Sequence, residues 1–179
     1  MTKSEIARPI KVRQLPGAPV IIDASEAERE ALARRFGITS IEELHAEITL
    51  DKESKAIVAT GRLSAQITQN CAISGEDFGV AIDEPLMFRF VEEGSLAAPV
   101  EEDDEIEIEL SPDDCDEIEY SGDSFDLGEA VAQSLGLAID PYAEGPGADE
   151  ARRKAGITSD EEQAPSGPLA EALAALKKD

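Results

Sequence analysis

Histidine and cysteine are the side chains best suited to chemistry at neutral pH, and this chain of 179 residues contains one histidine and two cysteines. The histidine, His45, stands between Glu43 and Glu47 on the polar side of an alternating run. Acid–base catalysis also needs a nucleophile or a second titrating group within reach, and no pattern around His45 supplies one. We therefore interpret His45 as a solvated surface residue and expect no catalytic residue and no enzymatic activity.

Neither cysteine has the companions that a disulfide framework or a metal site needs. Cys71 and Cys115 belong to a chain whose N-terminus has no secretory apolar run, so reduced thiols and a cytoplasmic location are expected. Ser74 follows Cys71 where a zinc knuckle would carry its second ligand, so no metal is expected. The sequence has no phosphate-binding glycine loop and no dinucleotide fingerprint, and no cofactor is expected.

Carboxylates are concentrated in one stretch. The chain has 40 acidic and 16 basic residues, a formal net charge of -24, and residues 90–151 hold 21 acidic residues without a lysine or arginine. We define residues 92–122 as the acidic segment. Its candidate partner-binding residues are the twelve carboxylates from 101 to 119: Glu101, Glu102, Asp103, Asp104, Glu105, Glu107, Glu109, Asp113, Asp114, Asp116, Glu117 and Glu119.

Several functions of the acidic segment can be compared. No spacing selects one carboxylate pair for hydrolysis, and the glycine turn and terminal glutamate of a calcium-binding loop are missing. Like charges at this density are typical of a solvated insert, and they also suit a docking site for a basic protein. These two interpretations stay open. The charge disfavours bulk attraction to DNA, RNA or anionic lipid, and no apolar run predicts a membrane span.

Hydrophobic periodicity predicts the elements that position these groups. Residues 26–36 predict a helix, because Ser25 and Glu28 have capping-box spacing and Gly37 follows as a stop. Alternating runs at 44–50, 57–71 and 78–90 predict three consecutive strands, an antiparallel meander with Cys71 on its buried side. A further strand is predicted at 106–110, and residues 5–22 read as an edge strand or extended lead-in interrupted by prolines.

The second half of the chain predicts helices and a linker. Asp126 and Glu129 form a second capping box before a helix at 127–138, residues 143–168 resemble a linker, and residues 168–178 form a small amphipathic tail helix. The predicted fold class is α+β, with an antiparallel meander sheet or open barrel and flanking helices. We expect one domain at 1–142 and a linker with a short C-terminal helix at 143–179.

Two stretches around the acidic segment resemble a known family. Residues 61–78 read GRLSAQITQNCAISGEDF and residues 123–142 read DSFDLGEAVAQSLGLAIDPY. In this order they are similar to the YceD family, which is linked to accumulation of large-subunit ribosomal RNA, and the tail PLAEALAALKK is similar to the terminal helix of many members. The residues that carry the resemblance are Gly61, Arg62, Cys71, Asp126, Leu127, Gly128 and Pro141.

The resemblance implies a nonenzymatic bacterial factor in ribosome biogenesis. Many members carry a second cysteine where this chain has Ser74, so it implies no metal site here. Because bacterial ribosomal proteins are mostly basic, the hypothesis is that the acidic segment binds a basic ribosomal protein or the pre-ribosomal large subunit. The alternative is a direct RNA-binding module, in which the N-terminal segment packs beside the helix at 26–36 to form a basic face: Arg8, Lys11, Arg13, Arg29, Arg34 and Arg35.

Overall fold

A five-stranded sheet is the centre of the computed structural model, which describes residues 4–53, 56–94 and 116–157. The elements in chain order are β1 (Pro9–Lys11), β2 (Val20–Asp23), α1 (Glu26–Phe36), β3 (Ser40–Glu53), β4 (Ala56–Asn70), β5 (Asp77–Glu92), β6 (Asp116–Tyr120), β7 (Ser124–Asp126), α2 (Leu127–Ala138) and α3 (Ala148–Ala155). The chain divides into two units, one with residues 1–69 and 77–141 and the other with residues 70–76 and 142–179.

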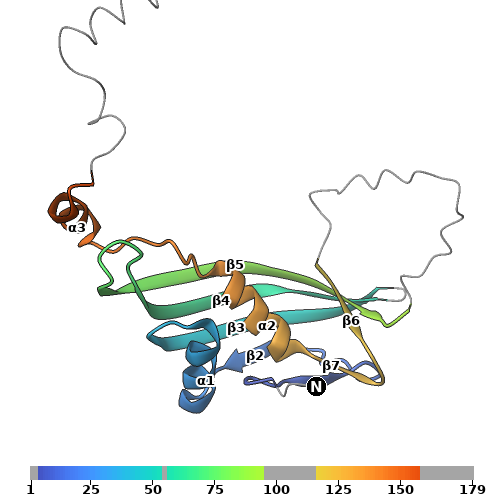
Figure 1. Cartoon of the computed structure of the whole chain (residues 1–179). Coiled ribbons are helices and arrows are strands. Elements are labelled where there is room, and N and C mark those ends of the chain that lie inside the picture. The colour runs from blue at the N-terminus through green and yellow to red at the C-terminus, as the bar shows by residue number, and fades with distance from the viewer. Residues whose placement is uncertain (1–3, 54–55, 95–115, 158–179) are drawn as a thin grey trace, which may run out of the picture. The chain divides into compact units, whose positions relative to one another are not determined.

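The sheet follows the strand order β2-β3-β4-β5-β6 and is not closed into a barrel (Figure 1). β3 pairs antiparallel with β2 and with β4, and β4 and β5 are neighbours joined by the turn at 71–76. A separate two-stranded antiparallel ribbon is formed by β1 and β7. The predicted α+β class is confirmed, and the meander corresponds to β3, β4 and β5 with β2 added at one edge.

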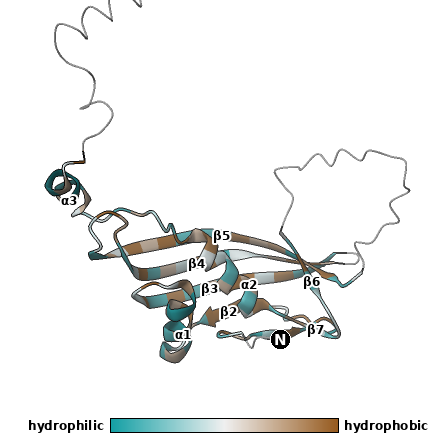
Figure 2. Cartoon of the chain, in the orientation of Figure 1, coloured by the Kyte–Doolittle hydropathy of each residue, from teal (hydrophilic) through white to brown (hydrophobic). Residues whose placement is uncertain are grey.

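One face of the sheet carries the core because the strands alternate apolar and polar residues. Along β3 the apolar residues Leu44, Ala46 and Ile48 are buried while the residues between them are exposed, and β4 repeats the pattern. Figure 2 shows this alternation along the strands, and α1 and α2 lie over the same face of the sheet (Figure 1). Each large side chain buried there contributes about 1.5–3 kcal/mol by leaving water.

β6 is a strand that the sequence does not predict. It runs parallel to β5, with Phe88 opposite Asp116 and Glu92 opposite Tyr120. Parallel neighbours need a long crossover connection, and residues 93–115 provide it. The acidic segment, residues 92–122, therefore contains both this connection and β6 itself. The strand predicted at 106–110 lies outside the described residues.

The two helices of the first unit begin where predicted, with different capping. At α1 the Glu28 carboxylate accepts hydrogen bonds from the backbone N–H and the hydroxyl of Ser25, at 2.7 and 2.8 Å, and Gly37 ends the helix at φ 69°. At α2 the Asp126 carboxylate caps the helix, but Glu129 binds Arg35 instead of completing a capping box. The second capping box is thus only half correct.

The second unit contains α3, at residues where the sequence predicts a linker. The eight residues of α3 carry Asp149 and Glu150 in the first turn and cations in the last, which complements the helix dipole. Lys154 pairs with Glu150 at 2.7 Å, and Gly156 ends the helix at φ 70°. The linker prediction is wrong at Ala148–Ala155 because these local charges favour a helix. The tail helix predicted at 168–178 lies outside the described residues.

Candidate functional site

The C-terminal end of the acidic segment is placed on the edge strand β6. Asp116, Glu117 and Glu119 lie within the strand, while the nine candidate carboxylates from Glu101 to Asp114 lie outside the described residues. Glu117 is exposed and 3.7 Å from the Arg89 guanidinium on β5. Glu119 is exposed, and its carboxylate makes no hydrogen bond or ion pair with any residue that the structure describes.

A cavity of about 340 Å³, which we call the aromatic cavity, lies next to Glu119 between β6, β7 and α2. Phe90, Tyr120 and Phe125 contribute to its lining. The rings of Phe90 and Phe125 stack at a centroid distance of 4.1 Å, and Tyr120 is tilted against Phe125 at 6.0 Å. The cavity is thus lined by aromatic rings of three strands, on the face of β6 that carries Ile118 and Tyr120.

The motif Asp126-Leu127-Gly128 fixes the N-terminal segment against α2. The Asp126 carboxylate accepts the backbone N–H of Arg8 at 2.8 Å and that of Gly128 at 3.0 Å. Leu127 is fully buried, and its N–H donates to the Arg8 carbonyl. A Cβ atom on Gly128 would lie 1.8 Å from the Ile6 carbonyl oxygen. The three motif residues therefore hold structure together and do not form a binding surface.

The motif Gly61-Arg62 lies in β4 and is also explained by packing. A Cβ atom on Gly61 would lie 2.1 Å from the Glu47 carbonyl oxygen in β3, so only glycine fits this close approach of two strands. Arg62 forms an ion pair with Asp83 of β5 on the exposed face of the sheet. The pair raises the pKa of Arg62 and lowers the pKa of Asp83. The motif thus connects three neighbouring strands.

Cys71 is buried, as its position on the strand predicts. Its sulfur accepts the backbone N–H of Ser74 at 3.3 Å. Hydrogen bonds from the Ser74 hydroxyl, the backbone of Ser74 and the backbone of Gly145 stabilise the thiolate and lower the pKa of Cys71 to about 7.

Pro141, the last motif residue, is exposed. It follows Asp140, whose backbone carbonyl accepts a hydrogen bond from the side chain of the buried Gln69 at 3.1 Å.

These motif residues all fall within the match to a known family. A family model described as large ribosomal RNA subunit accumulation protein YceD matches residues 59–178, which is more than half of the chain. The chain belongs to the YceD family. No curated protein and no solved structure matches it. The family predicted from residues 61–78 and 123–142 is confirmed.

The YceD match begins in β4, so it leaves the N-terminal cations outside. These cations are largely bound within the fold. Arg8 pairs with Glu28 at 2.7 Å, and Arg35 pairs with Glu129 at 2.7 Å and with Glu5 at 3.0 Å. The Arg29 guanidinium donates to the carbonyls of Ala24 and Ile41. We call Arg8, Arg29 and Arg35 the arginine cluster.

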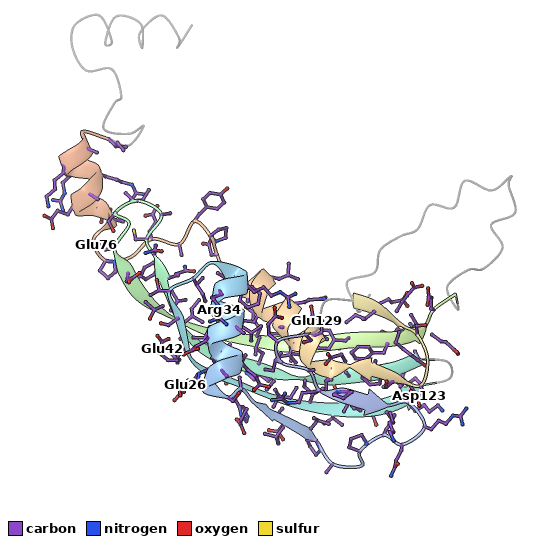
Figure 3. The ribbon with its side chains drawn as sticks, turned by 60° about the horizontal axis from the view of Figure 1, so that its bottom comes forward. Glu26, Arg34, Glu42, Glu76, Asp123 and Glu129 are labelled. Atoms are coloured by element: carbon purple, nitrogen blue, oxygen red, sulfur yellow. The ribbon has the colours of Figure 1, made fainter. Side chains whose placement is uncertain are left out.

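The ion pairs of the arginine cluster shift the pKa values of both partners. The hydrogen bond from Arg8 lowers the pKa of Glu28 to about 2, and Glu129 raises the pKa of Arg35. The N-terminal segment therefore packs beside α1 as predicted. The guanidinium groups of the arginine cluster, however, bind carboxylates and carbonyls of the same fold. Arg34 lies on the exposed side of α1, 4.0 Å from Glu30 (Figure 3). Lys11 and Arg13 form no ion pair with the described residues.

His45 lies on the exposed face of the sheet between two strands. Its Nδ1 is 2.6 Å from the Asp23 carboxylate of β2, and Ser64 of β4 is its register partner on the other side. No side-chain hydrogen bond joins His45 to Ser64 in the structure as described. Within residues 4–53, 56–94 and 116–157, no three histidine, cysteine or acidic side chains are arranged to hold a metal ion. In the same residues no helix is long and apolar enough to cross a membrane.

The aromatic cavity is the feature of the site that sequence reasoning missed. Its rings come from β5, β6 and β7, and only the fold brings them together. A signal was present, because Tyr120 directly follows Glu119 in a chain with only seven aromatic residues. An aromatic residue beside the last carboxylate of an acidic segment suits contact with a partner.

Proposed function

We propose that this YceD-family chain is a nonenzymatic ribosome biogenesis factor that supports accumulation of large-subunit ribosomal RNA. The family match over residues 59–178 is the observation that carries the role in ribosomal RNA accumulation. The factor acts by binding a basic ribosomal protein, alone or on the pre-ribosomal large subunit. Its acidic segment, residues 92–122, provides the binding surface. It uses no cofactor and acts in the cytoplasm.

Charge distribution supports a basic protein as the partner. Twelve carboxylates lie between residues 101 and 119, and no lysine or arginine occurs from residue 90 to residue 151. The field of such a segment attracts a cationic surface and repels phosphate. Glu117 and Glu119 are both exposed on β6, so the described end of the segment faces solvent. A partner can therefore bind there without unfolding the sheet.

The alternative, direct RNA binding through N-terminal cations, has less support. Three of the six proposed residues form the arginine cluster, whose guanidinium groups already bind carboxylates or carbonyls. An arginine held in such pairs would have to break them before it could bind phosphate. Lys11, Arg13 and Arg34 keep exposed charges, and they are few for the six to ten phosphate contacts of a typical nucleic-acid site.

Depletion of the protein in its native bacterium tests the proposed role. Sucrose gradients should then show fewer large subunits relative to small subunits, with reduced large-subunit ribosomal RNA. Unchanged levels of large subunits and their RNA would contradict the proposal.

Complementation of the depleted strain tests the acidic segment itself. We expect a variant with amides at Glu101, Glu102, Asp103, Asp104 and Glu105 to restore large subunits poorly. The matched control removes five exposed carboxylates from the sheet: Glu43, Glu47, Asp51, Glu53 and Glu84. This control should restore large subunits almost fully although its net charge is the same. Equal restoration by both variants would show that the acidic segment only keeps the protein soluble.

A further inference from the structure

We propose that the outer edge of β6 binds an extended segment of the partner as an added strand, in which basic residues alternate with apolar ones. The inference rests on the proposed function, because it takes the partner to be a basic protein. It adds a defined surface and a binding geometry to the charge attraction of the acidic segment. The surface is formed by β6, β7 and α2, which all belong to the first unit of the chain.

The outer edge of β6 has main-chain groups that are free to pair. β6 is the last strand of the sheet, and among the described strands it pairs only with β5. The Glu93 N–H donates to the Tyr120 carbonyl at 2.9 Å, so the main chain of Tyr120 points toward β5. Because successive residues of a strand direct their main-chain groups to opposite sides, Glu117 and Glu119 direct theirs away from β5. Neither bonds another described main-chain group there, and the edge offers unpaired donors and acceptors.

The two faces of β6 determine which side chains an added strand would need. Glu117 and Glu119 are exposed on one face, where Glu117 lies 3.7 Å from Arg89. Ile118 and Tyr120 lie on the other face and pack against the core. Residues that lie directly opposite each other in neighbouring strands share a face. An added strand would therefore place alternate residues beside the two carboxylates, where basic side chains fit, and the others beside Ile118 and Tyr120, where apolar side chains fit.

The aromatic cavity lies beside this edge and can receive an apolar side chain of the added strand. Glu119 lines the cavity although its side chain lies on the opposite face of β6, so its main chain contributes to the wall. Ala130 and Gln133 line it from α2. The carboxylates of Asp126 and Glu129 are already paired, so an apolar side chain can enter without burying a free charge. The cavity thus lies between a strand edge and a helix, where an added strand finds both main-chain partners and a pocket.

Charge favours a basic segment over the other strands that could occupy the edge. A second copy of this chain pairing through β6 would bring its own Glu117 and Glu119 against the same residues, and like charges directly opposite destabilise a strand pair. The alternating residues 106–110 of this chain would place Glu107 and Glu109 on the face of the same carboxylates. A segment with basic residues on that face avoids the repulsion and gives Glu119, which has no partner among the described residues, an opposite charge.

Amide hydrogen exchange measured by NMR gives a local readout of strand addition. The full-length protein would be titrated with a short peptide of alternating lysine and valine, with total binding measured by calorimetry. Exchange at the N–H groups of Glu117 and Glu119 should slow by roughly tenfold or more, because these groups become hydrogen-bonded. Exchange at Ile118 and Tyr120 should change less, because their N–H groups already face β5. A peptide with the same lysines and valines in two blocks has equal charge and should protect neither glutamate.

N-methylated peptides separate strand addition from charge attraction without altering the protein. One peptide carries N-methyl groups on its lysines and the other on its valines, at equal charge. Only one of these sets directs its N–H groups toward β6, the lysines in an antiparallel pair and the valines in a parallel pair. One peptide should therefore bind roughly five- to tenfold more weakly, while the other binds almost as well as the unmodified peptide.

Two substitutions at Glu119 separate the main chain of the edge from its charge. Glu119→Pro removes an outward N–H and leaves the bonds between β6 and β5 in place, so it should weaken peptide binding roughly tenfold. Glu119→Gln keeps the N–H and should weaken binding roughly two- to fivefold, the range for an exposed ion pair. Glu47→Gln is the matched control for charge, because Glu47 is exposed on β3, and it should leave binding nearly unchanged. Circular dichroism checks that each variant is folded.

Several results would overturn the proposal. Absence of peptide binding, binding without slower exchange at Glu117 and Glu119, or equal binding of the two N-methylated peptides would each exclude strand addition by a basic segment. Exchange that slows with protein concentration alone would identify a second copy as the occupant. Slow exchange in the free protein at every concentration would show that the edge already pairs within the chain. The peptide tests decide the matter even if Glu119→Pro does not fold. All these outcomes leave the proposed function intact, since that function fails if depletion leaves the large subunit unchanged.

Discussion

The arginine cluster and the edge strand β6 differ in whether their charged side chains have partners within the fold. In the arginine cluster each guanidinium has a partner within the fold, either a carboxylate or a backbone carbonyl. On β6 the Glu119 carboxylate is exposed and has no partner among the described residues.

The difference separates charges that hold the fold together from charges that are free to bind. A side chain whose charge is neutralised inside the molecule contributes to stability and offers little to an external partner. An exposed charge without a partner in the fold contributes little to stability and is available for recognition. Mutations in the two regions should therefore have different effects, on stability in one and on binding in the other.

The largest expected effect tests whether the N-terminal segment is part of the core. Gly128→Ala should destabilise the protein by about 3 kcal/mol or more, because its Cβ would meet the Ile6 carbonyl oxygen at 1.8 Å. Gly17→Ala is the matched control, since nothing lies within 4 Å of its Cβ position. Urea unfolding of both variants measures the difference. Equal stability of the two would contradict the packing of the N-terminal segment on α2.

An intermediate loss of stability is expected when the N-cap of α2, which also binds the N-terminal segment, is removed. Asp126→Ala should lower the free energy of unfolding by about 1–2 kcal/mol, because the helix loses its N-cap and the Arg8 backbone N–H loses its acceptor. Asp123→Ala changes the same residue type in the turn between β6 and β7 (Figure 3), and its side chain caps no helix. Thermal unfolding of the pair should show a clear shift only for Asp126→Ala.

A smaller effect concerns the pH dependence of the arginine cluster. Arg8 lowers the pKa of Glu28 from its ordinary value of 4.5 to about 2 in the folded protein. The carboxylate therefore stabilises the fold above pH 4.5, and this contribution is lost as the pH falls toward 2. In Glu28→Gln the free energy of unfolding, measured with urea, should fall less between these pH values than in the unsubstituted protein. An unchanged pH dependence would show that the ion pair is not maintained in solution.

The smallest effect on stability is expected for the cations that remain exposed. Replacement of Lys11, Arg13 and Arg34 by glutamine should leave Tm nearly unchanged, because Lys11 and Arg13 form no ion pair in the described chain and the pair of Arg34 with Glu30, at 4.0 Å, is exposed and weak. Filter binding should show little retention of large-subunit ribosomal RNA by the unsubstituted protein, and the substitutions should not change it. Marked RNA retention that these substitutions abolish would favour the RNA-binding alternative and weaken the distinction between the two regions.

Local sequence patterns predicted most of the sheet and its helices. The ends of α1 and α2 follow from Ser25, Gly37 and Asp126, which act on their own backbone neighbours. The buried faces of β3, β4 and β5 follow from alternation along most of each strand, with an interruption around Pro85 of β5 and a register shift between Ile41 and Glu43 of β3. The parallel pairing of β6 and the ribbon of β1 with β7 could not be predicted, because they depend on contacts between residues far apart in the chain.

The candidate site was predicted only in part for the same reason. The composition identified the acidic segment, but it could not show that Arg8 and Arg35 are bound by Glu28 and Glu129. It also could not show that Phe90, Tyr120 and Phe125 converge beside Glu119. Both features arise when the N-terminal segment, the sheet edge and α2 pack together.

Competition between a basic protein and RNA tests the central claim most directly. The full-length protein would be mixed with purified large-subunit ribosomal proteins and large-subunit ribosomal RNA, and the captured material would be quantified. We expect capture of a basic ribosomal protein that weakens with salt as the Debye length falls from about 10 Å at 0.1 M to about 3 Å at 1 M. The amide variant at 101–105 should lose this capture. Capture of RNA in place of protein, or equal capture by the amide variant, would contradict the account.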